Sequence, residues 1–166
     1  RESKNTIVSL GSLRSSQTDY DSELKQCDRI LFDFLVTDRD LNYDPMGIIT
    51  IRFQSLNKTF KSSKCEWLLR KNNIATLKGI GKINNRGNYG YLLIAKNSPD
   101  KLQIVIWDKN DGDKIIFDNL SPQNIQGFIN MYSWNTFYKD VPEEILSVPI
   151  SSSLEQNYPN PFNPTT

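Results

Sequence analysis

Histidine is absent from the 166-residue sequence. Its absence removes the usual general base, the commonest metal ligand and the side chain whose charge changes near neutral pH. Most hydrolase mechanisms lose their central residue, so we expect a protein that is not an enzyme and needs no cofactor. A glycosidase with two paired carboxylates is the one histidine-free enzyme that we weigh, and so short a chain disfavours it.

The sequence also lacks a long apolar run and a surplus of charge. No segment approaches the run of about 18 apolar residues that a membrane span requires. Lysine and arginine number 20 and aspartate and glutamate 19, which leaves a net charge of +1. Since no strong field is present to attract a polyanion, we expect neither a nucleic-acid partner nor a membrane span.

Cysteine is scarce, with Cys27 and Cys65 as the only two. Two cysteines so far apart do not form a zinc site or a CxxC redox motif. In an oxidising compartment they could pair, and the bridge would stabilise the fold by about 3–4 kcal/mol through the unfolded chain. The alternative is that both are small buried hydrophobic side chains.

Short apolar segments, separated by Gly, Asn, Asp and Pro, make up most of the chain. They are RILFDFLVTD (29–38), GIITIRF (47–53), KCEWLLR (64–70), NNIATLKGIGKI (72–83), NYGYLLIAK (88–96), LQIVIWD (102–108), KIIFDN (114–119) and QGFINMYSW (126–134). No amphipathic helix separates them, and only 121–128 and 142–146 could form a helical turn. The pattern predicts an all-β, antiparallel β-sandwich of the jelly-roll or Ig-like kind over residues 1–140.

Alternation along these segments predicts the core. The expected members are Phe32, Phe34, Ile49, Ile51, Phe53, Trp67, Leu69, Tyr91, Leu93, Ile104, Ile106 and Phe117. Trp107 is expected there too. Proline and serine in residues 141–153 indicate a linker. We expect residues 154–166 to form an extended tail, because three prolines prevent regular pairing there.

The tail carries the most specific pattern, LEQNYPNPFNPTT at 154–166. From Gln156 it resembles the opening of the C-terminal sorting domain of type IX secretion cargo. The residues of the motif are Leu154, Gln156, Asn157, Tyr158, Pro159, Asn160, Pro161, Phe162, Asn163 and Pro164. The resemblance implies secretion to the exterior or cell surface of a Gram-negative bacterium, with the secretion machinery as a partner through the full sorting domain. A proline-rich linker is the alternative.

Residues 79–119 carry a looser pattern, GIGKINNRGNYGYLLIAKN followed by DKLQIVIWDKNDGDKIIFDN. It is similar to a β-sandwich module of large bacterial surface proteins, in which G-x-G-x-I-N-G-x-G-x-Y precedes an I-x-I-W-D strand and Y-D-N. Asn85 and Phe117 stand where that module prefers Gly and Tyr. The resemblance implies a β-sandwich at the cell surface and supplies no catalytic residue.

Three further groups of residues are candidate sites. Asp38, Asp40, Asn42 and Asp44 alternate in one loop and could hold calcium, although they depart from the EF-hand pattern and also suit a solvated acidic loop. DKNDGD (108–113) and the glycines of residues 79–90 are better explained as turns and a bulge than as metal or phosphate loops. Tyr132, Trp134, Phe137 and Tyr138 form the best candidate for an exposed aromatic patch.

The sequence thus predicts a secreted or cell-surface structural or adhesive protein that is not catalytic. It could associate with itself, with the tail of one copy docking on a neighbour. The alternative is a carbohydrate-binding accessory module of a secreted glycoside hydrolase, which would require an exposed aromatic strip.

Overall fold

The computed structural model describes residues 3–14, 24, 29–38 and 43–135, which fall in a compact unit that spans Glu2–Trp134 and in Asn135, where the last strand ends. In these residues the chain is all-β, as predicted. The strands are β1 (Ser3–Arg14), β2 (Arg29–Thr37), β3 (Met46–Phe53), β4 (Lys58–Lys71), β5 (Ile74–Ile83), β6 (Arg86–Lys96), β7 (Lys101–Asp108), β8 (Lys114–Asp118), β9 (Gln123–Asn124) and β10 (Gln126–Asn135). Within the same residues the one helical segment is the short 3-10 turn η1 (Gln54–Leu56), and no helix has the length and apolar character to cross a membrane.

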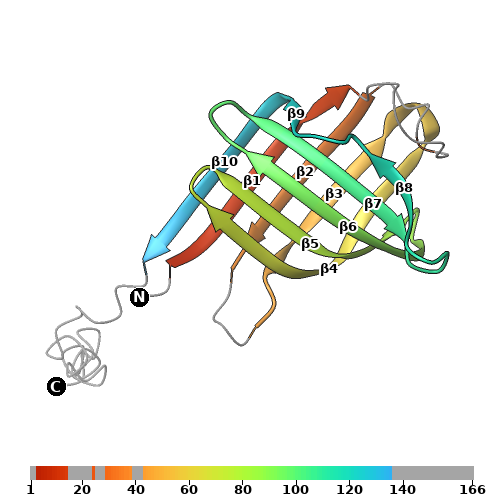
Figure 1. Cartoon of the computed structure of the whole chain (residues 1–166), viewed down its shortest axis with the longest axis horizontal. Coiled ribbons are helices and arrows are strands. Elements are labelled where there is room, and N and C mark those ends of the chain that lie inside the picture. Colours follow the sequence, from red (N-terminus) through yellow and green to blue (C-terminus); the bar gives the residue numbers. More distant parts are fainter. Residues whose placement is uncertain (1–2, 15–23, 25–28, 39–42, 136–166) are drawn as a thin grey trace, which may run out of the picture. The chain divides into compact units, whose positions relative to one another are not determined.

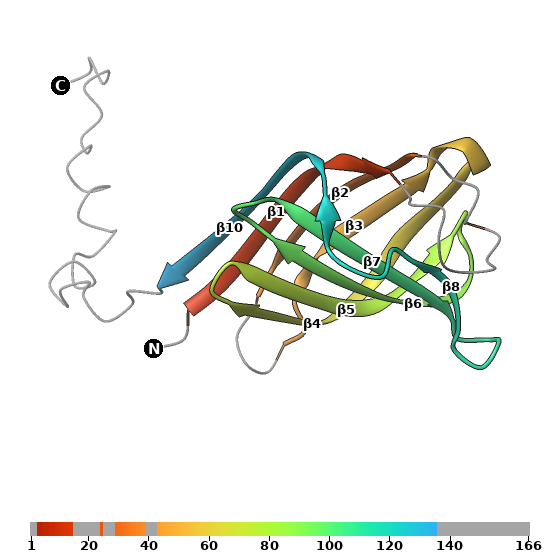
Figure 2. The ribbon, with the colours of Figure 1, turned by 45° about the horizontal axis from the view of Figure 1, so that its top comes forward.

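The strands form one continuous sheet in the order β10-β1-β2-β3-β4-β5-β6-β7-β8, with β9 paired to β7. The sheet curls, so that β10 and β1–β3 make one layer and β4–β8 cross in front of them (Figures 1 and 2). Right-handed strand twist, accumulated over many neighbours, produces this curl. The two facing layers are therefore continuous through β3 and β4 and are not two separate sheets.

The segment from β9 to β10 connects the two layers at one end. Lys101 and Leu102 of β7 pair with Asn124 and Gln123 of β9, and only Ile125 separates β9 from β10 in the opposite layer. The helical turn considered for residues 121–128 is wrong. Pairing with the start of β7 holds this short segment extended and overrides its local preference.

The core lies between the layers and contains most of the predicted residues. Buried are Phe32, Phe34, Ile49, Ile51, Phe53, Tyr91, Leu93, Ile104, Ile106 and Phe117. The rings of Phe53 in β3 and Phe117 in β8 meet edge to face, with their centroids 5.2 Å apart. Because these strands belong to different layers, the contact joins the two halves of the curled sheet.

The predicted burial of Trp67 and Leu69 is wrong, since these side chains are 39% and 63% exposed. The pairing of β4 with β5 shifts between Ser62 and Lys64 and again between Cys65 and Trp67. A bulge adds one residue to a strand and so reverses which side chains face the core beyond it. Cys65 is buried before the second bulge, and Leu68 packs against the core after it.

Strand β1 is absent from the predicted segments because its inward face is not uniformly apolar. Ile7 and Leu13 are buried, but between them Ser9 is buried too and donates to the backbone oxygen of Phe128 at 2.9 Å. A Cβ on Gly11 would stand 3.1 Å from the ring of Phe32. A serine and a glycine at core-facing positions hide the period of two on which strand prediction depends.

Candidate functional site

An apolar surface lies on the outer side of β1–β3 and β10. Val8 is opposite Leu35, which in turn is opposite Ile48, so the three form one row across three strands. Leu35 is 54% and Ile48 65% exposed. Together with the neighbouring exposed side chains the row makes what we call the outer apolar face, consisting of Val8, Leu10, Leu35, Met46, Ile48, Phe128 and Tyr132.

The composition of this face departs from what strand alternation leads one to expect. Alternate residues of β2 point into the core, namely Ile30, Phe32, Phe34 and Val36. The residues between them face the other side of the sheet, and in a strand with one buried face such residues are usually polar. Exposed aliphatic side chains in register across neighbouring strands make a contiguous apolar patch, and such patches on soluble proteins mark contact surfaces. The row itself contains no aromatic ring, so it suits a protein surface better than a sugar ring.

A polar pair borders the outer apolar face at one end. Thr6 and Thr37 are paired two positions before Val8 and two after Leu35, so they lie on the same side of the sheet, and their hydroxyls are 3.1 Å apart. An apolar centre with a polar rim is the usual anatomy of a protein interface.

The proposed calcium loop is described in part. Asp38 accepts the Asn5 hydrogen bond, and Asp44 forms an ion pair with Lys64 at 2.9 Å, which raises the pKa of that lysine. Asp40 and Asn42 lie outside the described residues, where the calcium site stays a prediction. Within the described residues, no group of three or more acidic or cysteine side chains is arranged to hold a metal ion.

The glycine-rich stretch of residues 79–90 has a structural role. Asn84 and Asn85 both have positive φ angles, 48° and 63°, as a tight turn between β5 and β6 requires. The register of these strands shifts between Gly81 and Ile83, which is the expected bulge. A Cβ on Gly79 would stand 2.7 Å from the hydroxyl of Tyr91, so this glycine leaves room for a buried ring.

Three polar residues of the 79–119 pattern, Asp108, Asp118 and Asn119, form hydrogen bonds to the backbone. Asp108 accepts from the amide of Asn110 at 2.8 Å, and Asp118 accepts from that of Leu120 at 2.6 Å. Asn119 is buried and accepts from the amide of Ile104 at 2.7 Å. Its own amide nitrogen donates to the oxygen of Leu102 at 3.0 Å, so the side chain stands in for a ladder partner along β7.

The side chain of Cys65 is buried, with 3% of its surface exposed. Its sulfur lies 3.5 Å from the backbone oxygen of Trp67 and 3.7 Å from that of Lys78. Burial raises the pKa of this thiol. Cys27 lies outside the described residues, so the disulfide stays a prediction.

The remaining predicted sites are covered only in part. Tyr132 is 48% exposed on β10, and Phe128, four residues earlier on the same strand, is 38% exposed. Trp134 belongs to β10 by its backbone, while its side chain and Phe137 and Tyr138 lie outside the described residues, as do residues 141–153 and the tail 154–166. Trp107 is only half-buried and packs on the outer side over Gly90, so its predicted place in the core is wrong.

Comparisons with known proteins do not identify a family. No family model matches the chain, and neither a curated protein nor a solved structure is significantly similar to it.

Proposed function

We propose that the protein is a structural or adhesive module of the bacterial cell surface that works by associating with itself and has no catalytic role. The observation that carries this proposal is the outer apolar face. Leu35 and Ile48, the exposed members of its aliphatic row, are costly to leave in water, and contact with another apolar surface removes that cost at about 25 cal/mol per Å² buried.

The occupant that we assign to the face is the C-terminal tail of a neighbouring copy. Leu154, Tyr158 and Phe162 are spaced four residues apart, which places successive side chains about 13 Å apart in an extended chain. Strands in a sheet are about 4.8 Å apart, so the distance from β10 to β3 is about 14 Å. Two successive anchors therefore match the width of the face.

Secretion by the type IX route is the second part of the proposal. It is supported by the similarity of residues 156–166 to the start of the sorting domain of type IX cargo. Fractionation of producing cells tests it: the protein should appear outside the outer membrane and should stay inside when the type IX machinery is inactivated. Release that is independent of this machinery would overturn the assignment.

Sedimentation velocity of matched double variants tests self-association. Leu35→Thr with Ile48→Thr removes apolar area from the row and places β-branched threonines, which suit a strand, at both positions. The control is Leu69→Thr with Ile74→Thr, since these side chains are similarly exposed on the opposite layer. We expect assembly to be lost in the first variant and kept in the control. Equal assembly of both variants would contradict the proposal.

A carbohydrate-binding module is less well supported on this face. The described aromatic side chains on this face are Phe128 and Tyr132, both on β10, whereas the row of Val8, Leu35 and Ile48 is aliphatic. The face therefore lacks the continuous strip of aromatic rings on which a sugar chain would stack.

A further inference from the structure

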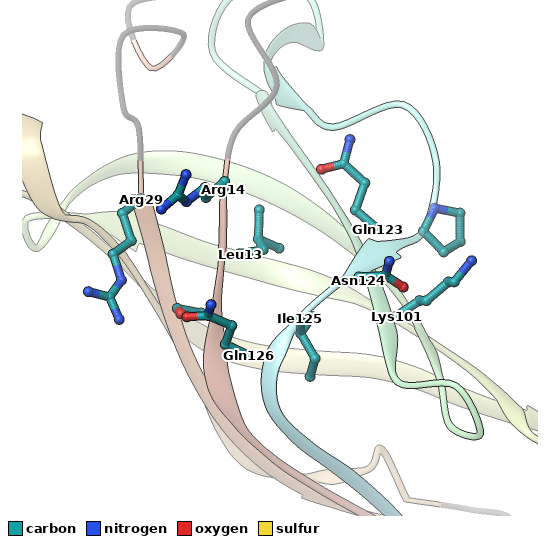
Figure 3. A pocket seen from close by; sticks show the side chains of 10 residues that line it. Leu13, Arg14, Arg29, Lys101, Gln123, Asn124, Ile125 and Gln126 are labelled. Carbon is teal, nitrogen blue, oxygen red and sulfur yellow. The ribbon is translucent and has the colours of Figure 1, made fainter.

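Two hollows that share part of their lining lie where β1 ends and β2 begins. The larger one has a volume of about 580 Å³, and the charged ends of Arg14, Arg29 and Lys101 around it point apart, so they do not converge on one ligand (Figure 3). The smaller one has a volume of about 310 Å³, and its lining includes Leu10 and Asp33. Because Leu10 also belongs to the outer apolar face, this smaller hollow continues that face. We call it the small hollow.

Asp33 places a carboxylate among apolar side chains in the small hollow. Strand pairing sets it opposite Leu10 of β1, and its neighbours on the same side of β2 are Leu31 and Leu35. The side chain is half-buried, and among the described residues it forms no hydrogen bond or ion pair. A carboxylate that an apolar partner covers loses its water and must gain a hydrogen-bond donor in exchange.

The two arginines that line the small hollow do not satisfy this carboxylate. Neither Arg29 nor Arg52 forms an ion pair with Asp33 in the part of the chain that the structure describes. Arg52 lies opposite Leu31 on β3 and is exposed, so its charge stays in water. A partner that covers the small hollow must therefore bring a donor of its own.

We propose that Tyr158 of a neighbouring copy fills the small hollow and donates a hydrogen bond from its hydroxyl to the carboxylate of Asp33. This inference rests on the docking of the tail on the outer apolar face. Among the three tail anchors only Tyr158 carries a donor, since Leu154 and Phe162 are purely apolar. A tyrosine suits a hollow with apolar sides and one acceptor, because its ring is apolar and its tip is polar.

The spacing of the anchors agrees with this placement. Leu10 in the small hollow and Ile48 on β3 are separated by two strand spacings and by two residues along the strands. These steps are about 10 Å and about 7 Å, or about 12 Å together. An extended chain places Leu154 and Phe162 each about 13 Å from Tyr158. With Tyr158 in the small hollow, a second anchor thus reaches Ile48.

Asp33 also determines which anchor docks in the small hollow. Leucine or phenylalanine there would cover the carboxylate without giving it a donor, and a buried group left unpaired in this way selects against the wrong partner. Asp33 is therefore a specificity-determining residue that fixes the position of the tail on the face.

A double-mutant cycle on the full chain, read by sedimentation velocity, tests the contact. Tyr158→Phe removes only the hydroxyl and should weaken association about tenfold, because the covered carboxylate is left unpaired. In a chain that carries Asp33→Leu, the same Tyr158→Phe substitution should have almost no effect, because two apolar groups then meet. Circular dichroism of each variant checks that the β-fold is kept.

Phe162→Leu is the matched control at a different anchor, and it should weaken association by the same factor with and without Asp33→Leu. If Tyr158→Phe weakens association equally in both backgrounds, or in neither, the contact with Asp33 is refuted, while docking by the tail stands as long as removal of residues 151–166 abolishes assembly. If the chain without residues 151–166 assembles like the full chain, docking by the tail fails and the contact fails with it.

Discussion

The indole ring of Trp107 in β7 lies directly over Gly90 in β6, its partner across the strand pair. A Cβ placed on Gly90 would stand 2.1 Å from Cε2 of that ring, which is closer than non-bonded atoms approach. The glycine is therefore required by the tryptophan, and the ring in turn covers backbone that glycine would leave exposed.

Gly90→Ala should destabilise the fold by about 1–3 kcal/mol, because the ring must move out of a packed position. Urea denaturation measures the change. In a chain that already carries Trp107→Ala, the same Gly90→Ala substitution should cost almost nothing, because the obstructing ring is gone. Equal costs in the two backgrounds would mean that the ring and the glycine are not coupled.

Core substitutions test the assignment of strand faces. Cutting Phe32, Ile51, Leu93 or Ile106 to Ala should each lower the free energy of unfolding by about 2–5 kcal/mol, since all four are buried. Leu69→Ala serves as the control and should change stability by less than about 0.5 kcal/mol, because Leu69 faces solvent after the bulge. A large loss from Leu69→Ala would contradict the placement of the bulge.

Asn119→Ala should cost about 2–4 kcal/mol. The substitution leaves the amide of Ile104 and the oxygen of Leu102 without their side-chain partner in a buried place. Thermal unfolding followed by circular dichroism would show the loss. Ser121→Ala, at an exposed position two residues away, is the comparison and should leave the melting temperature nearly unchanged.

Alkaline pH should destabilise the reduced protein through Cys65. Burial raises the pKa of this thiol in the fold, so the folded state keeps a proton that the unfolded chain loses above about pH 8.5. Folded stability is thus complete below that pH and falls as the pH rises above it. Urea midpoints between pH 7 and pH 10 should show this slope in the wild type and a shallower one in Cys65→Ala. Identical slopes would mean that Cys65 does not titrate in this way.

The sequence predicted the all-β fold, and ten of the thirteen residues expected in the core are buried, because most of their strands alternate regularly. β2 is the clearest case, with Ile30, Phe32, Phe34 and Val36 all buried. The prediction failed at the bulges of β4, where the backbone register and not the residue types decides which side faces inward. It also missed β1, whose inward face carries Ser9 and Gly11.

The outer apolar face was harder to predict from the sequence than the core was. Leu35 and Ile48 lie thirteen positions apart, and only the register of β2 and β3 places them side by side. Alternation could have flagged Leu35 and Ile48 as apolar residues on the water-facing side, but it could not have paired them.

Sedimentation velocity of a chain that ends at Ile150, compared with the full chain at the same concentrations, tests self-association through the tail most directly. Removing residues 151–166 takes away Leu154, Tyr158 and Phe162 and leaves β1–β10 intact. The full chain should form assemblies that grow with concentration, and the shortened chain should sediment as a folded monomer with an unchanged circular dichroism spectrum. A shortened chain that assembles like the full one would contradict docking by the tail.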